Sequence, residues 1–311
     1  MRTYVFGPVP SRRLGISLGV DLTPTKTCSY DCVYCQLSRT KFHTVKRDRF
    51  CPPNDVIEEL REVLSEIAAP DWITFSGTGE PTLNVDLGFI IAELKKFTQA
   101  PVCVITNSSL LHLEEVRNDL LLADRILPTL TTVRQSTFAH IHRPAPGIEL
   151  NDTLTGLKLF SGVFSGTIEI EIFVIPGIND SDEEIYGLHD FIETLPGITS
   201  IYLNTSVRAP LEHEVITADQ GRLDRFREKL NLKIPVSTAF EHSLVPLRPA
   251  NWNRVNASNE IMKLLLRHPC NYEQICQVLG IEPDRLTGII KKLLDENKII
   301  KLENGDFRLP D

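Results

Sequence analysis

The chain alternates short apolar runs with longer stretches in which apolar residues return every three or four positions. In residues 54–68, for example, apolar side chains recur at helical spacing from Val56 to Ile67, and Asn54 is placed to cap the first turn. The apolar runs predict strands at residues 14–22, 71–77, 101–106, 124–130, 166–175 and 199–204. The periodic stretches predict helices at residues 54–68, 85–97, 112–121, 151–161, 182–194 and 217–230.

Strands that are separated by helices pair in parallel through right-handed crossovers, so this order predicts an α/β protein. The uninterrupted apolar run from Ile172 to Ile175 suits a sheet that is covered on both faces. The fold is therefore expected to be an open doubly wound sheet or a partial or full (β/α) barrel. In a barrel, functional side chains gather just after the carboxyl ends of the strands, and the unusual residues of this chain lie there.

A second, smaller unit is predicted at the end of the chain. The composition changes near residues 245–260, which favours a linker. We expect a barrel at residues 1–245, a linker at 246–257 and a small domain at 258–311. Its helices are expected at residues 258–267, 271–279 and 283–296, and Asn304-Gly305 is typical of a hairpin turn of type I′. Three helices followed by a hairpin are typical of a winged helix-turn-helix domain.

Composition narrows the class of protein. The 311 residues are 42% hydrophobic and 24% charged, as in ordinary globular proteins. No apolar run reaches the roughly 18 residues of a membrane-spanning helix, and residues 1–15 lack the apolar core of a signal peptide. Seven cysteines in such a chain favour the reducing cytoplasm, where thiols serve metals or catalysis more often than disulfides.

The net charge of −8 argues against general nucleic-acid binding, but the charge is unevenly distributed. Residues 1–50 contain nine Lys or Arg and three Asp or Glu, a net charge of +6, and this excess surrounds three cysteines. It favours an anionic substrate beside them, because a guanidinium holds carboxylate or phosphate in a fork. The candidates are Arg12, Arg13, Arg143 and Arg208. Arg12 and Arg13 precede the first predicted strand, at its opposite end from the cysteines, so a structural role is an equal expectation for them.

Cys28, Cys32 and Cys35 follow the first predicted strand closely. An odd number of cysteines cannot close into disulfides among themselves, which favours metal binding. Three thiolates can hold three irons of a cubane iron–sulfur cluster and leave the fourth iron open to a small molecule. A structural zinc ion would need a fourth ligand, for which His43 is the nearest candidate, so zinc stays an alternative.

The remaining cysteines form no compact ligand set. Cys103 lies within a predicted strand and is expected in the core. Cys270 and Cys276 are expected to be buried around the helices of the small domain. Cys51 is the fourth cysteine outside the triplet.

Glycine and polar residues also follow the next strands. Glycines let the backbone approach a ligand, and a glutamate at such a place offers an acceptor for an ammonium group. The residues are Gly77, Thr78, Gly79 and Glu80 after the second strand, Asn107 and Ser108 after the third, and Thr129 after the fourth.

The spacing Cys-x3-Cys-x2-Cys, with Tyr34 just before the last cysteine, resembles the radical S-adenosylmethionine (radical SAM) superfamily. This resemblance implies a partial or full (β/α) barrel of that type and one [4Fe–4S] cluster held by Cys28, Cys32 and Cys35. It also implies that S-adenosylmethionine binds the open iron. Tyr34 is then expected to pack on the adenine or to shield the cluster.

The segment Gly77–Pro81 is similar to the Gly-Gly-Glu-Pro motif of the superfamily, with Thr78 in place of one glycine. The similarity implies that Glu80 receives the amino group of S-adenosylmethionine. By the same resemblance, the cofactor contacts include Gly77, Thr78, Gly79, Asn107, Ser108 and Thr129. Related sequences often have Ser-Leu-Asp where this chain has Thr129-Leu130-Thr131, so a role that needs the acid is not expected here.

Residues 7–24, the segment "GTGEPTL" and the segment Ile141–Pro144 resemble the Fe–S oxidoreductase group that includes tRNA wyosine synthases. Those synthases carry a second cluster with ligands upstream of the triplet. No cysteine precedes Cys28 here, so the wyosine reaction is not expected.

The resemblance implies an enzyme in which the reduced cluster cleaves S-adenosylmethionine to a 5′-deoxyadenosyl radical that takes a hydrogen atom from the substrate. It implies an electron donor such as flavodoxin or ferredoxin. The substrate is not specified by the sequence; RNA, a nucleotide or a protein would all suit an anion-binding site.

The small domain raises an alternative, a transcriptional regulator that contains an Fe–S cluster or zinc and uses the winged helix. Residues 256–311 carry eight Lys or Arg and nine Asp or Glu, whereas a DNA-binding surface normally shows a basic footprint. DNA is therefore not the expected partner. Docking of a protein or presentation of a substrate is the preferred role for this domain, and no membrane partner is expected.

Overall fold

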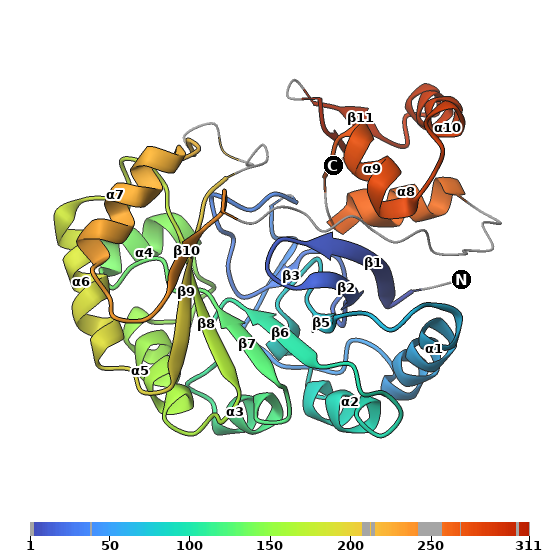
Figure 1. Ribbon diagram of the computed structural model, residues 1–311. Helices are drawn as coiled ribbons and strands as arrows, with labels where there is room; N and C mark the ends of the chain where they lie inside the picture. The colour runs from blue at the N-terminus through green and yellow to red at the C-terminus, as the bar shows by residue number, and fades with distance from the viewer. Residues whose placement is uncertain are drawn as a thin grey trace.

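A computed structural model of the protein describes residues 3–37, 39–206, 212, 215–241, 257–267, 269–302 and 305–310. At its centre is an eight-stranded sheet with the order β1-β2-β5-β6-β7-β8-β9-β10 (Figure 1). Its strands are β1 (Val5–Ser11), β2 (Gly15–Val20), β5 (Trp72–Phe75), β6 (Val102–Thr106), β7 (Arg125–Pro128), β8 (Thr167–Phe173), β9 (Ile198–Asn204) and β10 (Val236–Thr238).

All neighbouring strands are parallel except β1, which pairs antiparallel with β2. Within the described residues β1 and β10 are the two edges of the sheet and do not pair with each other. The sheet is therefore open along this seam. Of the predicted alternatives, this is an α/β fold with the parallel, partly closed sheet of a partial barrel.

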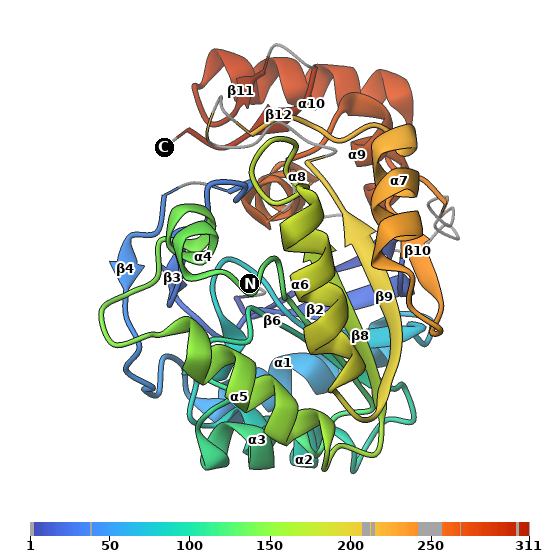
Figure 2. The same cartoon turned by 90° about the vertical axis from the view of Figure 1, so that its left-hand side faces the viewer.

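Helices cover the outer face of the sheet (Figures 1 and 2). They are α1 (Pro53–Glu66), α2 (Leu87–Leu94), α3 (Glu114–Leu120), α4 (Gln135–His142), α5 (Leu150–Ser161), α6 (Asp182–Glu193) and α7 (Gln220–Leu230). In α1, the predicted apolar stripe is buried, with Val56, Leu60 and Val63 at 0% exposure. These side chains join the inner residues of the strands in the main core.

Six elements of the described residues were not predicted. Strand β1 contains Pro8 and Pro10, and prolines are unfavourable within a sheet. They are tolerated here because β1 is an edge strand. Strand β10 has three residues, too few for a strand signal, and the sequence of helix α4, QSTFAHIH, has only Phe138 and Ile141 as large apolar residues, too few for a helical period. Two short strands, β3 (Thr27–Cys28) and β4 (Phe42–His43), flank the cysteine loop, and the 3₁₀ turn η1 (Pro81–Leu83) follows Glu80.

The end of the chain forms a second cluster of elements, which we call the C-terminal unit (described residues 257–310). It contains the predicted helices α8 (Ala257–Arg267), α9 (Tyr272–Leu279) and α10 (Pro283–Asp295) and the hairpin β11 (Ile300–Lys301) and β12 (Phe307–Arg308). They surround a separate apolar core. Asn304 and most of the predicted linker lie outside the described residues. The domain boundaries and the winged-helix assignment stay predictions.

Local chemistry explains how α9 begins and ends. Asn271 and Gln274 form a reciprocal capping box at its start. Gly280 closes the helix with φ +50°, a left-handed conformation that glycine adopts without strain.

Helices α8 and α9 lie against β1, so the C-terminal unit is docked on the edge of the sheet (Figure 1). The contact is polar at its centre. Arg267 Nε lies 3.1 Å from Asp21 Oδ2, and both side chains are buried. The Arg267 guanidinium also stacks over the Phe6 ring, 4.7 Å from its centroid. No helix among the described residues is long and apolar enough to cross a membrane.

We expect Arg267→Met to lower the free energy of unfolding by about 3 kcal/mol, because it leaves the Asp21 carboxylate buried without its counter-charge. Urea unfolding followed by circular dichroism measures the change. The double variant Asp21→Asn/Arg267→Met removes both charges and should recover part of the loss, whereas the exposed control Arg225→Met should behave as wild type. An unfolding curve of Arg267→Met that matches wild type would contradict this coupling.

Candidate active site

The carboxyl ends of β2, β5 and β6 lie side by side because these strands are parallel and in register. The segments that follow them meet there. Asp21 accepts hydrogen bonds from the Thr78 backbone N–H and hydroxyl, each at 3.0 Å. A Cβ on Gly77 would lie 2.2 Å from the Asp21 carboxyl carbon, so only glycine fits at this position.

The same turn is bonded to the start of the cysteine loop. Lys26 N–H donates to the Thr78 carbonyl and Glu80 N–H donates to the Thr27 carbonyl, both at 3.1 Å. A Cβ on Gly79 would lie 2.0 Å from the Thr27 oxygen, which again excludes any larger residue. The Gly77–Glu80 turn is therefore packed backbone to backbone against the residues that lead into Cys28.

Glu80 is buried at 3% exposure and its carboxylate accepts four hydrogen bonds. Oε1 accepts from the Thr82 N–H at 3.1 Å, the Thr82 hydroxyl at 2.7 Å and the Thr106 hydroxyl at 2.8 Å. Oε2 accepts from the Asn107 N–H at 2.7 Å. Burial raises the pKa of Glu80, and the four donors oppose that rise. Oε2, with one bond, keeps acceptor capacity for a further donor.

Each of the three predicted cysteine ligands has a nitrogen at its sulfur. The Asn107 amide lies 3.5 Å from Cys28 Sγ. His142 Nδ1 lies 3.2 Å from Cys32 Sγ, and Lys26 Nζ lies 3.1 Å from Cys35 Sγ. The three nitrogens come from three separate segments: the end of β6, the end of α4 and the entry to β3.

Burial raises the pKa of Cys28 to about 12 and raises the pKa of Cys32 well above its usual value. Both thiols therefore hold their protons at neutral pH in the absence of a counter-charge. The charge of a metal would displace those protons, and the neighbouring N–H groups would then donate to the thiolates.

His142 was not among the predicted site residues. Burial lowers its pKa to about 3, so the ring is neutral and carries one proton. Nε2 is hydrogen-bonded to the Thr131 hydroxyl. The arrangement that serves both partners has Nδ1–H donate to Cys32 and Nε2 accept from Thr131. In the sequence, the signal for His142 was the segment Ile141–Pro144, which resembles the Fe–S oxidoreductase group.

That segment also fixes the cysteine loop through its backbone. The carbonyls of Ile141 and His142 accept from the N–H groups of Val33 and Asp31, each at 2.9 Å. Arg143 Nε donates to the Asp31 carbonyl at 2.6 Å, and Nη1 lies 3.0 Å from the Glu212 carboxylate. Arg143, one of the predicted anion-binding residues, is thus committed to holding the loop.

Tyr34 is stacked on Phe173 of β8, with ring centroids 4.0 Å apart and an interplanar angle of 11°. This stack anchors the cysteine loop on the sheet, and a role of Tyr34 beside the adenine or the cluster stays a prediction. Asn107 faces the cysteines, since its amide also donates to the Ser29 hydroxyl at 2.8 Å. Ser108 is fully buried, and its hydroxyl donates to the Thr129 carbonyl at 2.9 Å. Ser108 and Thr129 are therefore joined to each other.

The remaining arginine candidates for anion binding differ in their surroundings. Arg13 Nη2 lies 2.7 Å from the Glu171 carboxylate, and Arg13 is buried within a network that also pairs Arg125 with Glu169 at 2.8 Å. Arg12 points into a cavity and pairs with no carboxylate among the described residues. Arg208 lies outside the described residues.

The other cysteines are apart from this site. Cys103 is fully buried in the sheet, as predicted, and Cys51 and Cys270 are buried as well. Cys276 is partly exposed, which differs from its prediction, because its position on the short helix α9 is at the edge of the small core.

Comparison with known proteins decides the family. The model of the "Radical SAM superfamily" matches residues 22–189, which include the cysteine triplet, the Gly77–Pro81 turn and the strand ends. The chain belongs to the radical SAM superfamily. Enzymes of this superfamily use a [4Fe–4S] cluster and S-adenosylmethionine. The resemblance drawn from the sequence is thereby confirmed.

Two relatives illustrate the similarity. A UPF0026 protein of Methanocaldococcus jannaschii is 34% identical over 310 residues, covering 97% of this chain and 93% of the relative. A protein named GTPase Obg, of Brachyspira hyodysenteriae, is 34% identical over 301 residues. That match covers 95% of this chain but 43% of the relative, so this radical SAM chain spans less than half of that protein.

Solved structures support the fold. SuiB of Streptococcus suis, bound to precursor peptide SuiA, matches with a TM-score of 0.54 and 17% identity over 71% of this chain and 48% of that chain. TYW1 with a lysine–pyruvate adduct matches with a TM-score of 0.53 and 17% identity over 74% of this chain and 76% of that chain. At these identities, the match shows a shared fold and nothing about substrate.

The donor set fits a cluster. Hydrogen bonds to cysteine sulfur are a recurrent means of tuning iron–sulfur clusters, and all three sulfurs have one within reach. Among the described residues no three His, Cys, Asp or Glu side chains lie close enough to share one metal ion. The zinc alternative also finds no fourth ligand in His43, which joins no such group; its Nε2–H donates to the Ser29 carbonyl at 3.1 Å. The comparisons give no support to the alternative of a transcriptional regulator.

We expect Glu80→Gln to lower the free energy of unfolding of the cluster-free radical SAM protein by about 1–3 kcal/mol, because an amide nitrogen would face buried donors. Chemical denaturation measures this loss. The exposed Glu58→Gln on α1 is the matched control and should be neutral. Equal stability of Glu80→Gln and wild type would show that the four hydrogen bonds do not hold this turn.

Proposed function

We propose that this protein is a radical SAM enzyme in which Cys28, Cys32 and Cys35 hold one [4Fe–4S] cluster. The observation that carries the proposal is the nitrogen at each sulfur: Asn107 at Cys28, His142 at Cys32 and Lys26 at Cys35. When bound and reduced, the cluster supplies the electron that cleaves S-adenosylmethionine to a 5′-deoxyadenosyl radical, which takes a hydrogen atom from the substrate.

The residues of the chain would then bind, orient and shield. Glu80 lies beside the loop and keeps acceptor capacity at Oε2 for the ammonium of S-adenosylmethionine. Gly77 and Gly79 let the turn pack directly against Asp21 and the Thr27 carbonyl, which fixes it beside the cysteine loop. Asn107 would contact the cofactor, whereas Ser108 and Thr129 would act by fixing the neighbouring turn.

Two partners belong to this proposal. The cluster needs a one-electron donor such as flavodoxin or ferredoxin. The C-terminal unit, which we propose to be a winged-helix-like domain, would serve protein docking or substrate presentation rather than DNA binding, given its lack of net positive charge.

The test is cleavage of the cofactor. Anaerobically reconstituted and dithionite-reduced protein is expected to convert S-adenosylmethionine to 5′-deoxyadenosine, detected by liquid chromatography and mass spectrometry. Cys32→Ala is expected to abolish this product, because one iron loses its protein ligand. Cys276→Ser, on the partly exposed face of α9, is the matched cysteine control and should keep the activity. A fully loaded cluster without any cleavage would refute the proposal.

His142 gives a second test. His142→Leu removes a hydrogen bond to the Cys32 sulfur, which stabilises the reduced, more negative cluster. We expect the midpoint potential to fall by about 60 mV, the one-electron equivalent of about 1.4 kcal/mol. Titration followed by electron paramagnetic resonance measures it. His142→Gln, which keeps a donor, should restore most of the potential; an unchanged potential in His142→Leu would exclude the tuning role.

A further inference from the structure

A cavity of about 260 Å³ lies between the interior of the sheet and the C-terminal unit. Its floor is formed by β2, β5, β6 and β9, through residues such as Ser17, Ser76 and Asn204. Its opposite wall is formed by Leu264 of α8 and Val278 of α9. Gln36, which directly follows Cys35, lines it as well, so the cavity borders the cysteine loop.

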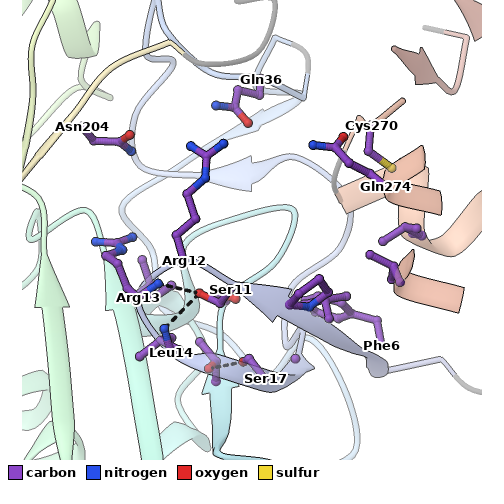
Figure 3. A pocket seen from close by; sticks show the side chains of 18 of the residues that line it. Phe6, Ser11, Arg12, Arg13, Leu14, Ser17, Gln36, Asn204, Cys270 and Gln274 are labelled. Carbon is purple, nitrogen blue, oxygen red and sulfur yellow. Dashed lines mark hydrogen bonds between the residues drawn. The ribbon is translucent and has the colours of Figure 1, made fainter. Parts of the chain in front are cut away.

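Arg12 occupies the middle of this cavity. Its side chain leaves the β1–β2 turn and ends between Gln36 and Asn204 (Figure 3). The turn lies at the amino end of β2, as the sequence predicted, but the side chain reaches back toward the cysteine loop. Among the described residues its hydrogen-bond partner is the Ala239 carbonyl, at a long 3.4 Å from Nη1. Most of the guanidinium donors therefore face the cavity.

The neighbouring arginine provides the contrast. Arg13 also lines the cavity, but Glu171 lies 2.7 Å from its Nη2 and Tyr202 stacks under its guanidinium at 4.6 Å. Its charge is balanced inside the protein. Arg12 is thus the positively charged residue of the cavity that forms no ion pair with a carboxylate of the described residues.

The turn that carries Arg12 is rigid. The Ser11 hydroxyl oxygen accepts from the N–H groups of Arg13 at 3.4 Å and Leu14 at 3.3 Å. Gly15 follows with φ +61°, and a Cβ there would lie 2.4 Å from the Asp71 carboxylate. The backbone that carries Arg12 is therefore already ordered before a ligand binds.

The side-chain amide of Asn204 is a second hydrogen-bond donor at the cavity. The Asn204 Oδ1 atom accepts from the Thr205 N–H at 2.9 Å, which directs Nδ2 elsewhere. No described residue accepts from that Nδ2, and the residue lines the cavity beside Arg12 (Figure 3). Phe6, Leu264 and Val278 supply an apolar wall on the side of the C-terminal unit.

We infer that this cavity binds a small organic anion, with its carboxylate or phosphate held by Arg12 and Asn204 and an apolar body against α8 and α9. The guanidinium fork matches the two oxygens of either group. The volume suits a small molecule, since pockets for drug-sized ligands start at about 300 Å³. As the substrate site of the enzyme, this inference rests on the proposed function; as a binding site, it stands on the cavity alone.

The test uses the reconstituted holoenzyme and three probes of similar size: phenylacetate, phenyl phosphate and the neutral phenylacetamide. Isothermal titration calorimetry is expected to show at least one anion binding tenfold or more tightly than phenylacetamide, and which anion does so identifies the head group. Arg12→Gln should weaken that anion about 10- to 100-fold, the loss of a charge-assisted hydrogen-bonded pair, and should leave phenylacetamide unchanged. Arg12→Lys, which keeps the charge but not the fork, should lie between.

Arg225→Gln, an exposed arginine on α7, is the matched control and should bind like wild type. If wild type binds the anions no better than phenylacetamide, or if Arg12→Gln binds them equally well, the inference is overturned. The wild-type comparison decides even if Arg12→Gln fails to fold. Displacement of the anion by bulk tRNA at equal phosphate concentration, but not by inorganic phosphate, would overturn the small-molecule assignment in favour of RNA.

Cleavage of S-adenosylmethionine is measured on the same preparations. Anion binding without cleavage would refute the proposed function and leave the site in place. Cleavage without anion binding would refute the site and leave the proposed function in place.

Discussion

The arrangement of this protein depends on one constraint, the parallel register of β2, β5 and β6. Parallel strands in register end at one edge of the sheet, so the segments after them must share a small volume. Asp21, the Gly77–Glu80 turn and Asn107 are brought together in this way, although Gly77 lies 56 positions after Asp21 and Asn107 lies 27 positions after Glu80. The turn bonds through its backbone to the entry of the cysteine loop, and Asn107 reaches the loop through its side-chain amide. The loop itself has little regular structure. The rigid sheet thus supplies the order that the loop lacks.

Much of the fold was accessible from the sequence, because long apolar runs and helical spacing report burial directly. The helices α1, α5, α6 and α7 and all strands from β2 to β9 in the central sheet were expected near their observed positions. Elements that depend on tertiary contacts were not. The edge strand β1 contains two prolines, and its pairing is favourable because β2 offers a partner, not because its own residues favour a strand.

The site shows the same division. Cysteine spacing and the Gly77–Glu80 segment could be read locally, since each works through neighbours in the sequence. The resemblance of Ile141–Pro144 pointed to the segment of His142 but not to its role, because that role comes from a contact with Cys32 across 110 positions. Arg12 and Arg13 are adjacent and chemically identical, and only the fold distinguishes them: β8 places Glu171 at one guanidinium and no described acid at the other. Sequence reveals which groups are available, whereas packing decides which of them are already used.

Four buried charged residues constrain the evolution of this protein: Arg13, Arg125, Glu169 and Glu171. Two positive and two negative side chains pair within the sheet. A substitution that neutralises one of them would leave its partner as an unpaired charge in the protein interior, which solvates charge poorly. Drift at these four positions is therefore expected to proceed by paired replacement. The four residues are therefore expected to be kept or replaced together, and through Arg13 they fix the cavity wall beside Arg12.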